Sequence, residues 1–248
     1  MAEFLLARWR NRWIRIRVRS KGLSSIARMN LTALDHLDLD QDVTQQRYVV
    51  FDLETTGLNL ARDRVVSVAA CRIADGRIPL GDTFSSLVNP GREIPSSSIK
   101  IHGIVPSMVA GAPLLKDVFD QFLQYLGTDI LVGYHVRFDL HFLNRYMKQN
   151  FGFPVQNLVL DTMRLYQRTV FPAHLRAYAY RFAGNHGLDD AARHFGIKIP
   201  GRHTASGDAL ATAMIFQQIL AGLVQKGQTR LRDLLSMSRA IKARTLAA

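Results

Sequence analysis

In the main part of this chain, three short apolar runs of strand length precede the first long segment of helical spacing, and two later runs alternate with such segments. The first three runs, at 48–51, 64–74 and 83–88, are rich in β-branched and aromatic residues, which favours strands. Two further runs, at 130–134 and 159–160, are separated by a helical segment. This order predicts an α/β fold in which helices flank a mixed sheet of five strands.

Helical spacing recurs between and after these runs. The expected helices are, in chain order, 113–126, 138–147, one that opens near Asp161, 188–195, 206–223 and a basic one within 229–243. The run 14–19 alternates apolar and basic residues as a strand does, but the spacing of Phe4, Ala7, Trp9 and Trp13 also permits a helix. Both interpretations stay open for the N-terminal segment.

The positive charge of the chain is concentrated at its two ends. The net charge of the 248 residues is +12, which indicates a polyanionic partner without specifying the chemistry. Both flanks are more basic per residue than the middle. We therefore predict three parts: a basic N-terminal extension and linker (1–46), a main domain (47–222) and a basic C-terminal helical tail (223–248).

Cys71 is the single cysteine of the chain. One thiol excludes a disulfide framework and a thiolate zinc cluster, and it fits a reducing compartment, so a cytoplasmic location is expected. No apolar run is judged long enough to cross a bilayer, and no integral membrane segment is expected. The N-terminal apolar stretch is too short for a secretory signal and runs into arginines.

Two carboxylates occupy alternate positions at the end of the first expected strand. Residues 51–58 read FDLETTGL, so Asp52 and Glu54 face the same side of a strand. Close carboxylates repel each other unless a cation lies between them, and oxygen ligands suit Mg²⁺ or Mn²⁺. A lone Asp-x-Glu is nevertheless more typical of two solvated acids before a turn.

Two later motifs add a third acid, and a fourth acid with a histidine. Asp139 lies at or near the start of the helix 138–147, where an acid is also favoured by the helix dipole alone. His203 lies in the loop before the helix that carries Asp208, and an imidazole accepts a proton near neutral pH. Taken singly, His203 and Asp208 are more typical of solvated surface residues.

Together the three motifs resemble the DEDDh family of 3′→5′ exonucleases, in particular the proofreading epsilon subunit of bacterial DNA polymerase III and its stand-alone relatives. The resemblance covers about residues 47–222. His203 lies five residues before Asp208, as the histidine branch of the family requires, and the position of the tyrosine in the sister branch is Thr204. The resemblance implies a ribonuclease H-like fold.

The resemblance also implies a site and a chemistry. The catalytic residues would be His203 and the four acids, and the acids would hold two divalent ions, Mg²⁺ or Mn²⁺: Asp52, Glu54, Asp139 and Asp208. His203 would take the proton from the attacking water, and the products would be nucleoside 5′-monophosphates. In relatives, side chains that contact or lie near the terminal nucleotide correspond to Thr55, Leu58, His102 and Phe138. The expected partner is single-stranded or 3′-ended nucleic acid, with DNA favoured.

Several alternatives stay open. The enzyme could trim RNA, because both nucleic acids offer the same phosphate. A non-catalytic, polymerase-associated module that binds nucleic acid is the rival of another class, although retention of all four acids and His203 argues against it. The arginines of residues 1–30 could bind nucleic acid, which is favoured, an anionic membrane or a partner protein. Residues 234–238 weakly resemble a sliding-clamp peptide, so association with a polymerase or clamp is a further hypothesis, but helix packing is the preferred interpretation.

Overall fold

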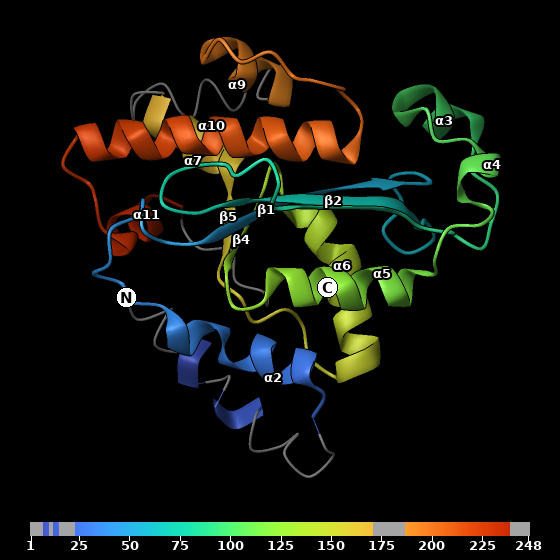
Figure 1. Ribbon diagram of the computed structural model, residues 1–248, viewed down its shortest axis with the longest axis horizontal. Helices are drawn as coiled ribbons and strands as arrows, with labels where there is room; N and C mark the ends of the chain where they lie inside the picture. The colour runs from blue at the N-terminus through green and yellow to red at the C-terminus, as the bar shows by residue number, and fades with distance from the viewer. Residues whose placement is uncertain (1–6, 10–11, 15–22, 171–186, 239–248) are drawn as a thin grey trace.

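The computed structural model describes residues 7–9, 12–14, 23–170 and 187–238 and is built around a five-stranded sheet (Figure 1). The strand order is β3-β2-β1-β4-β5. The strands are β1 (Tyr48–Thr55), β2 (Val65–Ile73), β3 (Thr83–Leu87), β4 (Ile130–Gly133) and β5 (Val159–Asp161). β1–β2 and β2–β3 pair antiparallel, whereas β1–β4 and β4–β5 pair parallel. The predicted mixed sheet of five strands is therefore confirmed.

Helices cover both faces of the sheet (Figure 1). One face carries α7 (Thr162–Val170), α9 (Leu188–His194) and α10 (Ala205–Gln225), with α11 (Leu231–Ser238) beside them. The other face carries α5 (Leu115–Leu126) and α6 (Arg137–Phe151). Two short helices, α3 (Ser96–His102) and α4 (Pro106–Val109), form a lobe at one end of the sheet. The sequence predicted the six helices on the two faces, but neither α3 nor α4.

Alternation along β1 sorts its side chains between the two faces. Tyr48 and Val50 lie in the core shared with α10, whereas Phe51 and Leu53 lie in the core shared with α5 and α6. The Tyr48 ring packs edge-to-face on Phe216 of α10, with 4.9 Å between the ring centroids. Since successive residues of a strand face opposite sides, the positions after Val50 with the same parity also face α10.

Residues before the sheet also belong to its core. The segment holds α2 (Ser25–Thr32) and the short 3₁₀ helix η2 (Ala33–His36), neither of which the sequence predicted. Leu34 and Val43 are buried with the α10 side of the sheet, and the buried Asn30 donates to Asn157 at 2.6 Å. On the C-terminal side, Leu234 of α11 is buried in the same core. The division at 46 and 222 stays a prediction about domains, but the packing crosses both boundaries.

Among the described residues, α10 is the helix that is long and apolar enough to cross a membrane, judged by length and composition alone. The expectation from sequence that no run reaches this length is wrong on that point. The packing gives a different reason for the composition, because 61% of the apolar window is buried inside the protein. An apolar helix that covers the middle of a sheet needs core residues on most of its circumference.

The two flanks are described only in part. Residues 7–9 and 12–14 are helical, and the exposed rings of Trp9 and Trp13 pack edge-to-face at 5.6 Å. Most of the alternating run 14–19, and the part of the predicted basic helix beyond residue 238, lie outside the described residues.

Candidate active site

Asp52 and Glu54 lie in the second half of β1, which pairs with β2 but no longer with β4. Asp52 faces Ala69 and Glu54 faces Ser67 across the antiparallel pair with β2. On the β4 side, the parallel pairing ends at Val50. Both carboxylates continue the row that faces α10, so they point toward that helix where β4 no longer flanks them.

Asp208 comes from the first turn of α10, the helix that these acids face. Thr204 caps the helix, because its hydroxyl accepts a hydrogen bond from the Gly207 amide at 3.1 Å. A Cβ on Gly207 would overlap the carbonyl oxygens of Pro200 and Gly201. Glycine at this position therefore lets the preceding loop approach the helix and holds it beside Asp208.

Three carboxylates converge between β1 and α10. Oxygen atoms of Asp52, Glu54 and Asp208 all lie within 4.8 Å of one another. Asp139 lies in the first turn of α6; burial raises its pKa, and the charge of Glu54 raises it further. The charge of Asp139 in turn raises the pKa of Asp52, so the fourth acid lies near Asp52 and Glu54, on the opposite layer.

These acids raise one another's pKa. Burial raises the pKa of Asp52 well above its ordinary value, and the charges of Asp139 and Glu54 raise it further. Burial also raises the pKa of Glu54 to about 8, with Asp208 as the main charged contributor. Like charges that share a poorly solvated site favour protonation unless a cation compensates them.

The cluster fits divalent cations such as Mg²⁺ or Mn²⁺. Its converging ligand atoms are all carboxylate oxygens, and hard oxygen ligands suit these ions. A cation would also offset the repulsion that raises the pKa of the buried acids. Asp52, Glu54 and Asp208 could hold an ion directly, with Asp139 beside them.

His203 lies in the loop immediately before α10. Its backbone has φ 62°, and its amide donates to Asp208 Oδ1 at 3.4 Å. The ring is exposed, and its Nδ1 lies 3.3 Å from Nη1 of Arg202. The loop therefore places His203 next to Asp208, and the role of its imidazole as a base stays a prediction.

His102 and Thr55 form a second pair near the end of β1. The buried His102 ring accepts at Nδ1 from the Ile104 amide at 3.0 Å. Burial lowers the pKa of His102, and the nearby Thr55 backbone raises it by less. Because Nδ1 accepts a hydrogen bond, the ring carries its proton on Nε2, which has no hydrogen-bond partner among the described residues.

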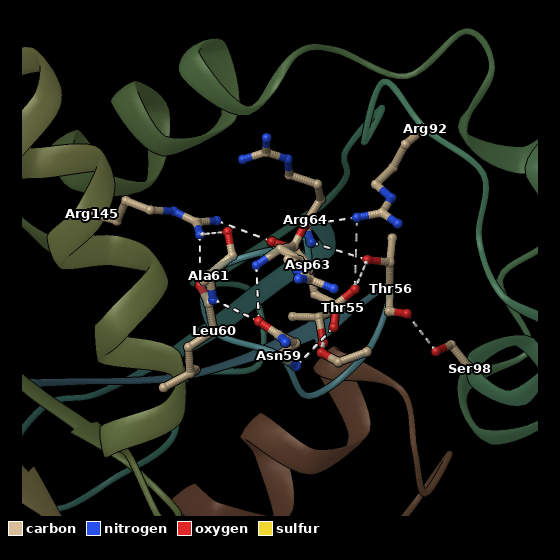
Figure 2. Close-up of polar contacts among 12 residues, drawn as sticks. Thr55, Thr56, Asn59, Leu60, Ala61, Asp63, Arg64, Arg92, Ser98 and Arg145 are labelled. Atoms are coloured by element: carbon tan, nitrogen blue, oxygen red, sulfur yellow. Dashed lines mark hydrogen bonds and ion pairs between the residues drawn. The ribbon is translucent and has the colours of Figure 1, made fainter.

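The loop after β1 is held in place from several directions (Figure 2). Asp63 accepts from the Thr56 hydroxyl and from the Asn59 amide, both at 2.8 Å. Ser98 of α3 donates to the Thr56 carbonyl at 2.8 Å. Leu58 lies within this loop with 84% of its surface exposed. A fixed loop that presents one apolar side chain to solvent is suited to contact a ligand.

Phe138 directly precedes Asp139 in the first turn of α6. It is half-buried and packs edge-to-face on Phe142, with 5.2 Å between the ring centroids. The roles of Phe138 and Leu58 in substrate binding stay predictions.

Sequence reasoning missed Arg202 as a member of the site. Its Nη1 forms an ion pair with Asp208 Oδ2, and its Nε forms one with Asp189 Oδ1 at 2.8 Å. The only sequence signal was an arginine directly before the candidate histidine. The buried Asp161 was also missed, and it raises the pKa of Asp139 from the end of β5.

Comparison with known proteins agrees with this geometry. Residues 49–216 match the RNase T exonuclease family. The DNA polymerase III epsilon subunit of Aquifex aeolicus is 37% identical over 187 residues, which cover 75% of this chain and 87% of that protein. A DNA polymerase III epsilon-like protein of Rhodobacter capsulatus is 41% identical over 185 residues, 73% of this chain. The match spans only 25% of that longer relative.

Solved structures share the fold, which is ribonuclease H-like. Exonuclease I of E. coli in complex with a dA16 oligonucleotide superposes with a TM-score of 0.61 at 20% identity, covering 77% of this chain and 43% of that one. Exonuclease X in complex with 5′ overhanging duplex DNA superposes with a TM-score of 0.55 at 23% identity, covering 77% and 98%. The family match over most of the chain, together with the acid cluster, shows that this protein belongs to the exonuclease family and is similar within it to DNA polymerase III epsilon subunits.

Proposed function

We propose that this chain is a metal-dependent 3′→5′ exonuclease that releases nucleoside 5′-monophosphates, with DNA as its favoured substrate. The observation that carries the proposal is the convergence of Asp52, Glu54 and Asp208 within 4.8 Å. Such a cluster favours a bound cation, and phosphodiester hydrolysis is chemistry that paired cations support. Membership of the exonuclease family supports a nucleic-acid substrate. The DNA bound to exonuclease I and exonuclease X supports DNA over RNA.

The four acids would hold two divalent ions. Asp52, Glu54 and Asp208 would ligate directly, and Asp139 would serve the second ion. When bound, the ions would lower the pKa of the attacking water and stabilise charge on the scissile phosphate and the leaving oxygen. The acids' own part is to stay ionised once a cation compensates their mutual repulsion.

The remaining residues would move a proton and bind the strand end. His203 would accept the proton of the attacking water at an imidazole nitrogen. His102 would donate its unpartnered Nε2–H to an acceptor of the terminal nucleotide, next to Thr55. Leu58 and Phe138 would supply apolar contacts to the bases.

A gel assay on single-stranded DNA labelled at its 5′ end tests the proposal. In Mg²⁺ or Mn²⁺, the purified protein should shorten the labelled strand stepwise and release nucleoside 5′-monophosphates, which mass spectrometry identifies. A matched RNA oligomer of the same sequence tests the RNA-trimming alternative. Immediate release of the 5′ label as a mononucleotide would contradict the direction, and no cleavage by the folded protein would contradict the activity.

A further inference from the structure

Arg202 occupies a position between two carboxylates of different kinds. Its Nη1 pairs with Oδ2 of Asp208, one of the converging acids, while its Nε pairs with Oδ1 of Asp189 at 2.8 Å. Asp189 lies in the first turn of α9, and its side chain is 54% exposed. The Asp208 side chain is 9% exposed, so one guanidinium joins a buried acid to a solvated one.

The same guanidinium also touches the candidate base. Nη1 of Arg202 lies 3.3 Å from Nδ1 of His203. A guanidinium only donates hydrogen bonds, so Nδ1 must be the acceptor and its lone pair is engaged. Arg202 therefore engages an oxygen of a metal-ligand candidate and a ring nitrogen of the candidate base at once.

Arg202 supplies positive charge to the acid cluster. Its charge lowers the pKa of Asp52, Glu54 and Asp208, against the rise caused by burial. A divalent ion bound to Asp208 Oδ2 would share that oxygen with Nη1, and the two cations would repel each other at so short a separation. Guanidinium and metal ion therefore compete for this carboxylate.

The backbone around Arg202 is held in place, so that only the Arg202 side chain can move away from Asp208. The loop before α10 packs against Gly207, where no Cβ could be accommodated, and the Thr204 hydroxyl donates to the Gly201 carbonyl at 2.6 Å. Withdrawal from Asp208 would leave the pair with Asp189 intact, because that pair uses Nε rather than Nη1.

We propose that Arg202 is a positioning residue that acts as a latch, which holds Asp208 and His203 in the metal-free enzyme and withdraws to Asp189 when a divalent ion binds. This inference rests on the proposed metal-dependent function and describes how a divalent ion enters that site. The latch offsets the charge of the cluster while it is empty, which limits the repulsion among buried carboxylates. Its release frees Asp208 Oδ2 and His203 Nδ1 in one movement.

The test is the affinity of the full chain for Mn²⁺ alone, measured by calorimetry or by electron paramagnetic resonance. Arg202→Gln should bind Mn²⁺ more tightly, by roughly tenfold, because the competing cation is gone. Asp189→Asn should bind it more weakly, by roughly threefold, because Arg202, without a second carboxylate to share its charge, would then pair with Asp208 alone and compete more strongly with the ion. In the Arg202→Gln background, Asp189→Asn should not change the Mn²⁺ affinity further, since no arginine remains to pair with residue 189.

Asp190→Asn is the matched control for charge alone. Asp190 neighbours Asp189 on α9 but pairs with Arg193, at 2.9 Å. Its neutralisation should leave the Mn²⁺ affinity unchanged. The latch would be overturned if Asp189→Asn weakened Mn²⁺ binding equally with and without Arg202. It would also be overturned if Arg202→Gln left the Mn²⁺ affinity unchanged.

Asp52→Asn separates failure of the latch from failure of the proposed function. Mn²⁺ binding that is lost in Asp52→Asn but insensitive to Arg202 would leave the metal site standing and overturn the latch alone. No Mn²⁺ binding by the folded wild-type protein would overturn both proposals. Circular dichroism of each variant confirms that the fold is retained.

Discussion

The Arg145 guanidinium on α6 donates a hydrogen bond to the carbonyl oxygen of Leu60 at 2.7 Å (Figure 2). A second donor, Nη2, reaches the Asp63 carbonyl at 3.1 Å. One side chain therefore fastens the loop that carries Leu58 to the helix that carries Asp139. The two expected sides of the substrate site are held at a fixed separation by this contact.

Arg145→Met should loosen that loop without disturbing the acids. Hydrogen bonds from a charged donor contribute about 1.5–3 kcal/mol each, so we expect kcat/KM on single-stranded DNA to fall about tenfold, chiefly through KM. Lys148→Met, on the same helix and exposed, is the control. Mn²⁺ affinity should stay at the wild-type value in both variants, and a fall in Arg145→Met would contradict the assignment of Arg145 to the loop.

Gly207→Ala should displace the loop that carries Arg202 and His203. Its Cβ would overlap the backbone oxygens of Pro200 and Gly201, which cannot be relieved by a side-chain rotation. We expect exonuclease activity to fall about 100-fold or more, because a small misplacement of catalytic groups is costly. The comparison is Gly222→Ala on the same helix, where a Cβ meets nothing within 4 Å.

Gly222→Ala should keep full activity and raise the free energy of unfolding by up to about 1 kcal/mol, because alanine favours a helix over glycine. Thermal unfolding and the gel assay measure both quantities. Equal activity in the two alanine variants would show that the close approach at Gly207 is unimportant for the site.

Glu54→Gln should change how stability depends on pH. Burial raises the pKa of Glu54 from 4.5 to about 8 in the folded protein. A carboxyl whose pKa is higher in the folded state stabilises the fold fully below the unfolded pKa, and this contribution is lost as the pH rises through about 8. In EDTA, the melting temperature should therefore fall from about pH 5 to about pH 9 by more in the wild type than in Glu54→Gln.

Mn²⁺ should reverse that loss at the higher pH, because a ligand that binds only the folded state stabilises it. A steeper decline in Glu54→Gln than in the wild type would mean that Glu54 is not crowded by the other acids.

Asp52→Ala should abolish exonuclease activity, lowering kcat by about 1,000-fold or more, while the domain stays folded. The reason is that Asp52 adjoins all three other acids, since burial and the charge of each of them raise its pKa. Removal of one of four repelling carboxylates should also raise the melting temperature of the metal-free protein. Full activity in the folded variant would refute the assignment.

Much of this fold could be predicted from local patterns. The strands were visible because β1 opens with four apolar residues and because β2 and β4 are almost wholly apolar, as is typical of buried strands. Alternation within a strand is also enough to place Asp52 and Glu54 on one side of β1. The helices α3 and α4 were missed because they have almost no buried apolar side chains to produce helical spacing: α3 buries Ser98 and His102, and α4 buries Val109.

The parts that escaped prediction depend on contacts between distant segments. α2 was overlooked because its buried face includes the polar Asn30, whose side chain is hydrogen-bonded to Asn157, 127 residues later. In the sequence, Arg202 is one of many basic residues. Its role in the site depends on ion pairs with Asp189 and Asp208, which come from two different helices. No short window of sequence contains those three residues in a pattern that identifies an ion pair.

The position of β1 as the middle strand has a consequence for how the protein fluctuates. Amide hydrogens of a central strand exchange with solvent only when most of the molecule opens, whereas loop amides exchange through small local openings. Val49 and Val50, which pair on both sides, should therefore exchange slowest within β1, and Asp52 and Glu54 follow them on the same strand. The acids would keep their positions while the Arg202 side chain moves, so that ions and strand ends can enter and leave without disturbing the sheet.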